Sequence, residues 1–412
     1  MSGILLMVRR SLRHHLLART VTSLSTALGS GLFLAVFSLS AQSKQAFEGV
    51  PSGFNAVLGA RGSELQLVLN TVFHLETSPG NIPWSLYEEI KGNRLVELAI
   101  PYAVGDNYHG YRIVGTTPDY FDKVEYREGE KFKVRGRFFD PLRRQAVVGS
   151  YVAQQMGLKL GQIINPYHGL TFDPSAIHAD EFHVVGILEP TNSPADRVIW
   201  IPLEGVFRMS GHVLADGSKP KMSEAIPDEY KAISAVMLKL RRGGGMQLSQ
   251  NINRRGNVAT LAWPINRVML DFFKKLGWMN DVLRVVAYLV VVVAGAGILA
   301  SIYNTIQERR REFAILRALG ARRATVFTAI VSESAVIAGL GAVLGYVVYG
   351  AVLFGAASII RTQTGVVIDL GRWHDTLWQT PLGMIGIGAL AGVLPAYKAY
   401  STDVASNLIP AS

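Results

Sequence analysis

The residues best suited to binding chemistry form one short segment, Glu308 to Arg323, which reads ERRREFAILRALGARR. It contains six arginines and two glutamates, and it lies between two long apolar stretches. Arginine binds carboxylates through paired hydrogen bonds, and apolar side chains beside it can be buried in a partner's cleft. The segment therefore predicts a protein-docking surface. The alternative is that its arginines only fix the membrane topology.

The positions assigned to this surface combine charge with an apolar face. The charged and turn positions are Glu308, Arg309, Arg310, Arg311, Glu312, Arg317, Gly320, Arg322 and Arg323. The apolar positions are Phe313, Leu316 and Leu319.

Motifs for catalysis are missing from the sequence. It contains no cysteine, no GxxxxGK[ST] phosphate-binding loop and no HExxH zinc motif. Thiol chemistry, P-loop nucleotide binding and zinc proteolysis are therefore disfavoured. We expect no catalytic residue and no cofactor on this chain.

One group of side chains invites comparison with a metal site: His168, His178 and His183 beside Asp173, Asp180 and Glu181. Imidazole and carboxylate groups do bind transition metals, but the spacing fits no compact ligand pattern. Scattered surface histidines are the favoured interpretation, so we expect no metal.

Four apolar segments are long enough to cross a membrane, which takes about 20 residues of helix. They are Thr20–Ser43, Val285–Ile302, Ser334–Ile360 and Thr376–Tyr397. The first has no small-residue cleavage site followed by a polar terminus, so we expect it to stay as an anchor. An amphipathic helix is predicted before it. The sequence thus predicts a multi-pass membrane protein.

The net charge of +10 is concentrated on one side of this predicted membrane protein. Residues 1–41, the charged segment and the tail together contribute +8, whereas residues 44–281 contribute only +2. Lysine and arginine collect in cytoplasmic loops, so both termini and the charged segment are predicted to be cytoplasmic. A nucleic-acid surface is not needed to explain the charge.

These observations divide the chain into seven predicted segments. They are residues 1–43 (amphipathic helix and first span), 44–280 (exported domain with stalk), 281–306 (second span), 307–323 (cytosolic coupling helix), 324–360 (third span), 361–375 (short external loop) and 376–412 (fourth span and cytosolic tail).

The large inserted segment is predicted to be an α+β domain, because short apolar runs alternate with brief helical patterns and frequent turn signals. Predicted strands are Arg112–Val114, Ala146–Val148, Phe182–Leu188 and Val198–Ile201, and predicted helices are Trp84–Lys91 and Ser150–Met156. The apolar run Leu65–Phe73 could receive an acyl chain, but a place in the core is the favoured interpretation.

Two features of the spans bear on assembly. An amphipathic pattern from Asn266 runs into the second span as a candidate stalk helix, unless Gly277 breaks it. In the third span, Gly341 and Gly345 form a GxxxG motif that permits close helix packing, within the chain or with a second protomer. Glu333 lies near the cytosolic end of that span and is either functional or paired for assembly.

Several of these motifs together resemble the MacB/LolC/FtsX class of ABC transporter permeases. The elbow ERRREFAILRALGARRATV resembles the family's coupling segment, and Glu333, Gly341 and Gly345 match its E…GxxxG pattern. The runs VGTTPDYFD, AVVGSYVAQQMGLKLGQII and FHVVGILEPTNSPADRVIWIPL are similar to its periplasmic core domain. The tail GVLPAYKAYSTD departs from the family pattern, because Val404 stands where a proline is usual.

The resemblance implies a four-helix permease with a MacB-like periplasmic core inserted between the first two helices. It implies a location in the bacterial inner membrane and a dimer with an identical copy or a paralogue. It also implies two copies of a separate cytosolic ABC ATPase, which would bind the ATP and magnesium. A periplasmic or outer-membrane partner is a further implication.

Two functions fit this resemblance. In the first, ATP hydrolysis moves the exported domain to export or extract a substrate, by mechanotransmission through the helices. In the alternative, as in FtsX-like proteins, the same lever activates an extracytoplasmic partner and nothing is transported. The substrate class stays open among lipoprotein, lipid, peptide, drug and metal-related cargo. The exported domain is the expected site for substrate or partner, because the spans offer only Glu333 as an ionisable group.

Overall fold

The structure is a computed structural model that describes residues 16–48, 53–127, 129–168, 180–209, 226–256, 258–364 and 373–401. The chain divides into two compact units. The membrane unit comprises Met1–Ser43, Leu276–Ser358 and Asp369–Ser412, and the exported unit comprises Lys44–Lys275 and Ile359–Ile368. The predicted amphipathic helix before the first span lies outside the described residues, as do Val404 and most of the external loop.

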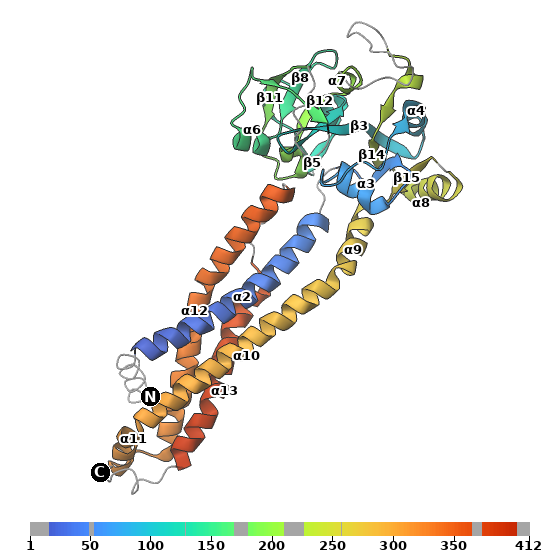
Figure 1. Cartoon of the computed structure of the whole chain (residues 1–412). Helices are drawn as coiled ribbons and strands as arrows, with labels where there is room; N and C mark the ends of the chain where they lie inside the picture. Colours follow the sequence, from blue (N-terminus) through green and yellow to red (C-terminus); the bar gives the residue numbers. More distant parts are fainter. Residues whose placement is uncertain are drawn as a thin grey trace. The chain divides into compact units, whose positions relative to one another are not determined.

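Four long apolar helices form the membrane unit, which confirms the predicted four-helix class (Figure 1). They are α2 (Leu16–Glu48), α10 (Gly277–Glu308), α12 (Arg323–Thr364) and α13 (Asp375–Ser401). The 42 residues of α12 would extend about 60 Å at ~1.5 Å per residue, roughly twice the hydrocarbon thickness. Helix α12 is therefore long enough to project beyond the bilayer.

Small residues let the membrane helices approach closely. A Cβ atom added to Gly345 of α12 would lie 2.1 Å from Ser30 Oγ of α2, and one added to Gly341 would lie 2.5 Å from Thr26 Cβ. By contrast, Gly350 has nothing within 4 Å of such an atom. The GxxxG motif thus packs against a helix of the same chain, one of the two partners considered from the sequence.

The candidate stalk consists of two helices. Helix α9 (Ile265–Lys275) ends just before Leu276, and α10 begins at Gly277. The expected break at Gly277 is therefore present, and a single helix from Asn266 onward is not. Glycine is the poorest helix former after proline, so an interruption at this point is physically reasonable.

An eleven-stranded sheet is the frame of the exported unit, and its main path runs β15-β1-β14-β3-β4-β12-β8-β11-β7. The strands on this path are β15 (Ala259–Ala262), β1 (Ala56–Ala60), β14 (Ala235–Leu240), β3 (Val96–Tyr108), β4 (Tyr111–Thr116), β12 (Ile199–Pro202), β8 (Gln145–Val148), β11 (Phe182–Leu188) and β7 (Val134–Gly136). Strands β10 (Tyr167–His168) and β9 (Ile163–Ile164) pair with β3 and β11. Two small sheets pair β13 (Ala232–Ile233) with β2 (Ile82–Pro83), and β5 (Glu125–Arg127) with β6 (Glu130–Lys131).

Strand β3 joins two halves of the sheet. Its first part pairs with β14 from Val96 to Tyr102, and its second part pairs with β4 from Ala103 to Tyr108, with an irregularity between Val104 and Asn107. The two halves are called lobe 1 (the β15, β1 and β14 side) and lobe 2 (the β4, β12, β8, β11 and β7 side). One continuous strand, β3, therefore connects the two lobes.

Both faces of the sheet are buried, because alternate residues of a strand point to opposite sides. On β12, Ile199 and Ile201 belong to one core cluster, whereas Trp200 belongs to the other. Helices α4 (Trp84–Lys91), α6 (Ser150–Met156), α7 (Leu203–Phe207) and α8 (Gly244–Ser249) contribute to the first cluster, and α3 (Glu64–Thr71), α5 (Asp119–Lys123) and α9 contribute to the second.

The exported unit confirms the predicted α+β class and most of its predicted elements. Helices α4 and α6 and strand β11 have the predicted bounds, and β4, β8 and β12 differ by a few residues at most. In the apolar run after the first span, Leu67 and Val68 are fully buried in the second core cluster. The core interpretation of that run is confirmed, because a receptor for an acyl chain would need these side chains at the surface.

Candidate functional site

The predicted docking segment forms a short helix, α11 (Arg310–Ala318), between α10 and α12. Its start is fixed at Arg309, whose backbone (φ −101°, ψ 10°) ends α10 and precedes α11. Its end is a Schellman motif, in which Gly320 N donates to Arg317 O and Ala321 N donates to Leu316 O. Gly320 has a left-handed φ of 98°, which a side chain would strain. The elbow is thus a defined helix with both ends capped by the backbone.

One side of α11 packs against the membrane unit. Ala314 is buried, and Phe313 contacts the core cluster that contains Ile302, Ile306 and Val326. The guanidinium group of Arg309 lies 5.0 Å from the Phe313 ring. Phe313 is therefore partly buried against the interior of the protein.

The other side of α11 is open. Leu319 is 81% exposed, and Ile315 is also exposed although the sequence did not single it out. Arg311, Arg322 and Arg323 are exposed close to these apolar residues in the sequence. We call four exposed residues the elbow face: Arg311, Ile315 and Leu319, which recur every four residues along α11 and its C-cap, and Arg322, which follows the turn at Gly320.

The remaining predicted docking positions differ in accessibility. Glu308 and Glu312 are exposed, whereas Leu316 and Arg317 are only partly accessible. The Arg310 side chain lies outside the described residues. Of the apolar trio expected from the sequence, Leu319 alone is well exposed.

Two of the predicted residues meet at a buried ion-pair site. Arg309 Nη1 lies 3.4 Å from Glu333 Oε2, and the other oxygen of Glu333 pairs with Arg19 of α2. The side chains of Arg19, Glu333 and Arg309 are only 5%, 8% and 14% exposed. A charged group in a membrane helix must be paired, and Glu333 is held by two arginines from different segments.

Arg19 was not assigned a role from the sequence. It lies 314 positions before Glu333, and its only sequence signal is a positive charge at the end of a predicted span. The positive-inside rule already accounts for such a charge, so nothing local marks Arg19 as a partner.

The histidine cluster gives no metal centre in the described part of the chain. No group of three histidine, aspartate or glutamate side chains converges there. Asp180 pairs with Arg144, and His183 is exposed on β11. His178 and Asp173 lie outside the described residues.

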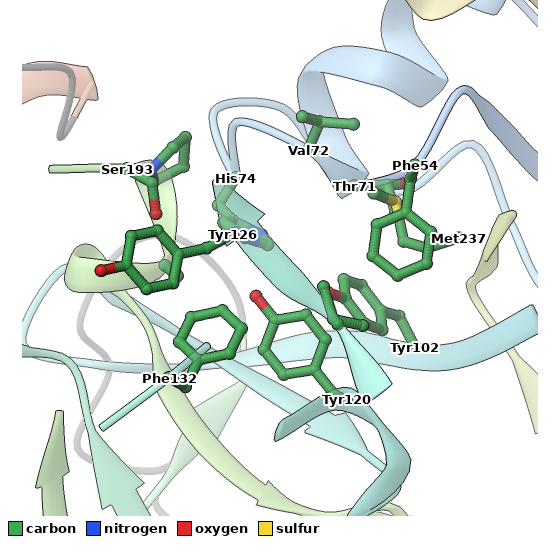
Figure 2. A pocket seen from close by; sticks show the side chains of 13 residues that line it. Phe54, Thr71, Val72, His74, Tyr102, Tyr120, Tyr126, Phe132, Ser193 and Met237 are labelled. Carbon is green, nitrogen blue, oxygen red and sulfur yellow. The ribbon is translucent and has the colours of Figure 1, made fainter. Parts of the chain in front are cut away.

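A small cavity that was not predicted lies at the seam between the two lobes (Figure 2). Its volume of about 40 Å³ fits little more than one water molecule, whose share of the liquid is roughly 30 Å³. Tyr102, Tyr120, Tyr126, Phe132 and His74 are among the side chains that line it. It is too small to hold an organic cargo.

His74 is the unusual residue of this cavity. The residue is partly buried, its Nδ1 atom is buried without a hydrogen-bond partner among the described residues, and its backbone φ is 57°. Burial, reinforced by the charges of Arg112 and Arg197, lowers the pKa of His74 to about 3, although a backbone hydrogen bond at Asn70 opposes the shift. The imidazole is therefore neutral throughout the physiological range.

A larger recess of about 400 Å³ opens on lobe 2. Its polar lining residues are Arg135, Ser150, Gln154 and Glu189, and its apolar lining residues are Ala153, Leu158, Ile187, Leu188 and Pro190. The volume is within the usual range for small-molecule sites, and the mixed lining suits a peptide or an amphiphile.

Comparison with known proteins assigns the chain to a family. A family model described as MacB-like periplasmic core domain matches residues 20–247, which is more than half of the chain. A second model, FtsX-like permease C-terminal, matches residues 284–404. The chain belongs to the MacB/FtsX family of ABC transporter permeases.

Curated relatives agree with this assignment. The pyoverdine export ATP-binding/permease protein PvdT of Pseudomonas aeruginosa is 24% identical over 328 residues, which are 76% of this chain and 44% of PvdT. A macrolide export ATP-binding/permease protein MacB of Bdellovibrio bacteriovorus is 24% identical over 67% of this chain and 40% of its own length. The chain thus spans less than half the length of these relatives. The crystal structure of the periplasmic region of MacB from Actinobacillus actinomycetemcomitans matches 56% of this chain and 98% of that region, at 12% identity and a TM-score of 0.33.

Proposed function

We propose that this chain is the permease subunit of an ABC transporter whose elbow helix α11 docks on a separate cytosolic ATPase. ATP and magnesium would be bound by that ATPase, in two copies on a permease dimer. Its motion would be carried through the membrane helices to the exported unit, for export or extraction of a substrate. The observation that carries the proposal is the elbow face, an exposed apolar stripe flanked by arginines.

The energetics favour a partner on this face. Leu319 is 81% exposed, and burying a leucine side chain completely is worth about 1.5–3 kcal/mol. The arginines beside it add directional hydrogen bonds to carboxylates of a partner. A loop that served only to fix topology would need the charges but not the exposed Ile315 and Leu319.

Charge and hydropathy of the elbow face can be tested separately by co-purification of the ATPase with the full chain. Leu319→Glu should reduce recovered ATPase at least tenfold, and Arg311→Glu with Arg322→Glu should do the same. Arg361→Glu is the matched control, because Arg361 is also an exposed arginine but lies at the opposite end of α12. Undiminished ATPase binding by the elbow variants, with correct membrane topology, would contradict the docking proposal.

We place the chain in the inner membrane with cytoplasmic termini. Exposed tryptophans lie near the starts of α10 and α13, at Trp278, Trp373 and Trp378. Exposed tyrosines lie near the other ends of these helices, at Tyr303, Tyr397 and Tyr400. Two aromatic belts of this kind are typical of residues at the two membrane surfaces, and the arginine-rich elbow favours the tyrosine end as cytoplasmic.

The alternative function is an FtsX-like lever that activates an extracytoplasmic partner without transport. Both functions would use the recess on lobe 2, since its size fits a ligand or a peptide. ATPase stimulation by candidate cargo in reconstituted membranes supports transport. A stable extracytoplasmic hydrolase whose activity requires ATP, with no cargo moved, would support the lever instead.

A further inference from the structure

Four charged side chains form an alternating series at the cytosolic end of the membrane unit. Arg19 of α2 pairs with Glu333 of α12, Glu333 pairs with Arg309, and Arg309 Nε lies 3.0 Å from Glu312 Oε2 of α11. The series therefore connects the first span, the third span and the elbow helix. Glu312 is 65% exposed, so the buried part of the series ends at Arg309.

Arg309 occupies the joint between α10 and α11. Its backbone belongs to neither helix, and its guanidinium group reaches one helix through Nε and another through Nη1. The planar guanidinium holds its donors in a fixed fork, so the two ion pairs constrain each other's direction. A tilt of α11 at this joint must move the Arg309 guanidinium group, which is paired with the Glu333 carboxylate.

Glu333 is the member shared by both buried pairs. Its two oxygens are divided between Arg19 and Arg309. Buried ions are strongly destabilising when a partner leaves, so displacement of one arginine draws the carboxylate or the other arginine with it. Packing of α2 on α12 at Ser30 and Gly345 keeps the first span close enough to follow.

We propose that Glu333 is the shared anchor of an ion-pair relay, in which the linked side chains transmit displacement of the elbow helix to the first membrane span. The elbow then has two routes to the exported unit, directly along α10 and through the relay along α2. The relay draws on the proposed docking function only for the origin of the force. Its existence is a property of this chain and is measured without the ATPase.

The test measures each end of the relay while the opposite end is altered. Because the chain contains no cysteine, pairs of introduced cysteines can be spin-labelled in lipid nanodiscs without background. Leu24→Cys with Leu394→Cys reports the position of α2 against α13, and Ala318→Cys with Leu394→Cys reports the position of α11. All three positions are exposed.

Reciprocal effects are expected, because coupling between two sites is symmetric in free energy. Arg309→Gln should shift or broaden the distance between the spin labels at positions 24 and 394, which reports α2. Arg19→Gln should do the same for the distance between positions 318 and 394, which reports α11. Arg267→Gln is the matched control, since Arg267 is an exposed arginine paired with Asp271 of the same helix, α9. A change only in the distance that reports the altered helix, or no change in either distance, would overturn the relay. This result would do so even if ATPase docking is correct.

Charge inversion keeps the test decisive if single variants fail to fold. Arg19→Glu with Glu333→Arg repairs one pair and leaves the other repulsive, so it should not restore the native distances or the yield of folded protein. Adding Arg309→Glu and Glu312→Arg inverts all four charges of the series, including the Arg309–Glu312 pair, and should restore both. Full recovery by the double variant would show that Glu333 serves Arg19 alone, and failure of the quadruple variant would also refute a shared anchor.

Discussion

Acidification from pH 7 to pH 5 is expected to destabilise the exported unit through His74. This imidazole is partly buried at the seam between the lobes, with ring centroids of Trp200 and Tyr102 5.9 and 6.5 Å away. In the unfolded chain the same ring is solvated and takes up a proton readily. Unfolding in acid is therefore linked to proton uptake at this residue.

The pKa values set the sign and size of the effect. Burial, with Arg112 and Arg197 as further causes, lowers the pKa of His74 from 6.5 to about 3. The unfolded state then binds more protons than the native state, so stability is complete above pH 6.5 and is lost as the pH falls toward 3. Between pH 7 and pH 5 the loss is about 2 kcal/mol from this one group.

The assay is urea unfolding of the full chain at both pH values, followed by tryptophan fluorescence, with His74→Asn as the comparison. Asparagine does not titrate and tolerates the left-handed backbone at this position. Burial raises the pKa of Asp196, which acts in the opposite direction, but this term is common to both proteins and cancels in the difference. Equal pH dependence in the native chain and the His74→Asn variant would refute the reasoning.

Three further predictions concern helix packing, a buried carboxylate and the oligomeric state. Gly345→Ala should cost about 1–3 kcal/mol by overpacking against Ser30, whereas Gly350→Ala, which meets no atom within 4 Å, should stay within about 0.5 kcal/mol in thermal unfolding. Asp196→Asn should cost about 1–3 kcal/mol in urea unfolding, because the carboxylate accepts hydrogen bonds from the Thr191 amide and hydroxyl. The permease should be a dimer by mass photometry in mild detergent, and a monomer that retains ATPase activity would contradict the assembly.

Local elements could be predicted from the sequence where the signal lies within a few residues. Helix α6 follows Gly149 and stops at Gly157, whose φ of 64° is a typical glycine end, so its bounds were predictable. Strand β11 is a seven-residue run, FHVVGIL, that is apolar except for the exposed His183. The spans were predictable for the same reason, since length and the absence of charge are properties of one segment.

Pairings between distant segments could not be predicted. Strand β12 lies parallel to β4 on one side and antiparallel to β8 on the other, and nothing in the Ile199–Pro202 segment specifies either neighbour. The elbow's charge was visible in the sequence, but the side it presents depends on how Phe313 packs against the spans. Similarly, the seam cavity requires residues from both lobes to meet around His74.

The distribution of charge in the spans limits how a cargo could travel. Between their charged ends, the four spans contain Glu333 as the one acidic or basic side chain, and it is already held by Arg19 and Arg309 near the cytosolic end. A polar cargo crossing the bilayer would need compensating groups near the centre. The chain offers its recess of about 400 Å³ in the exported unit instead. These features support the proposal that the membrane helices carry motion and that the exported unit selects the cargo or partner.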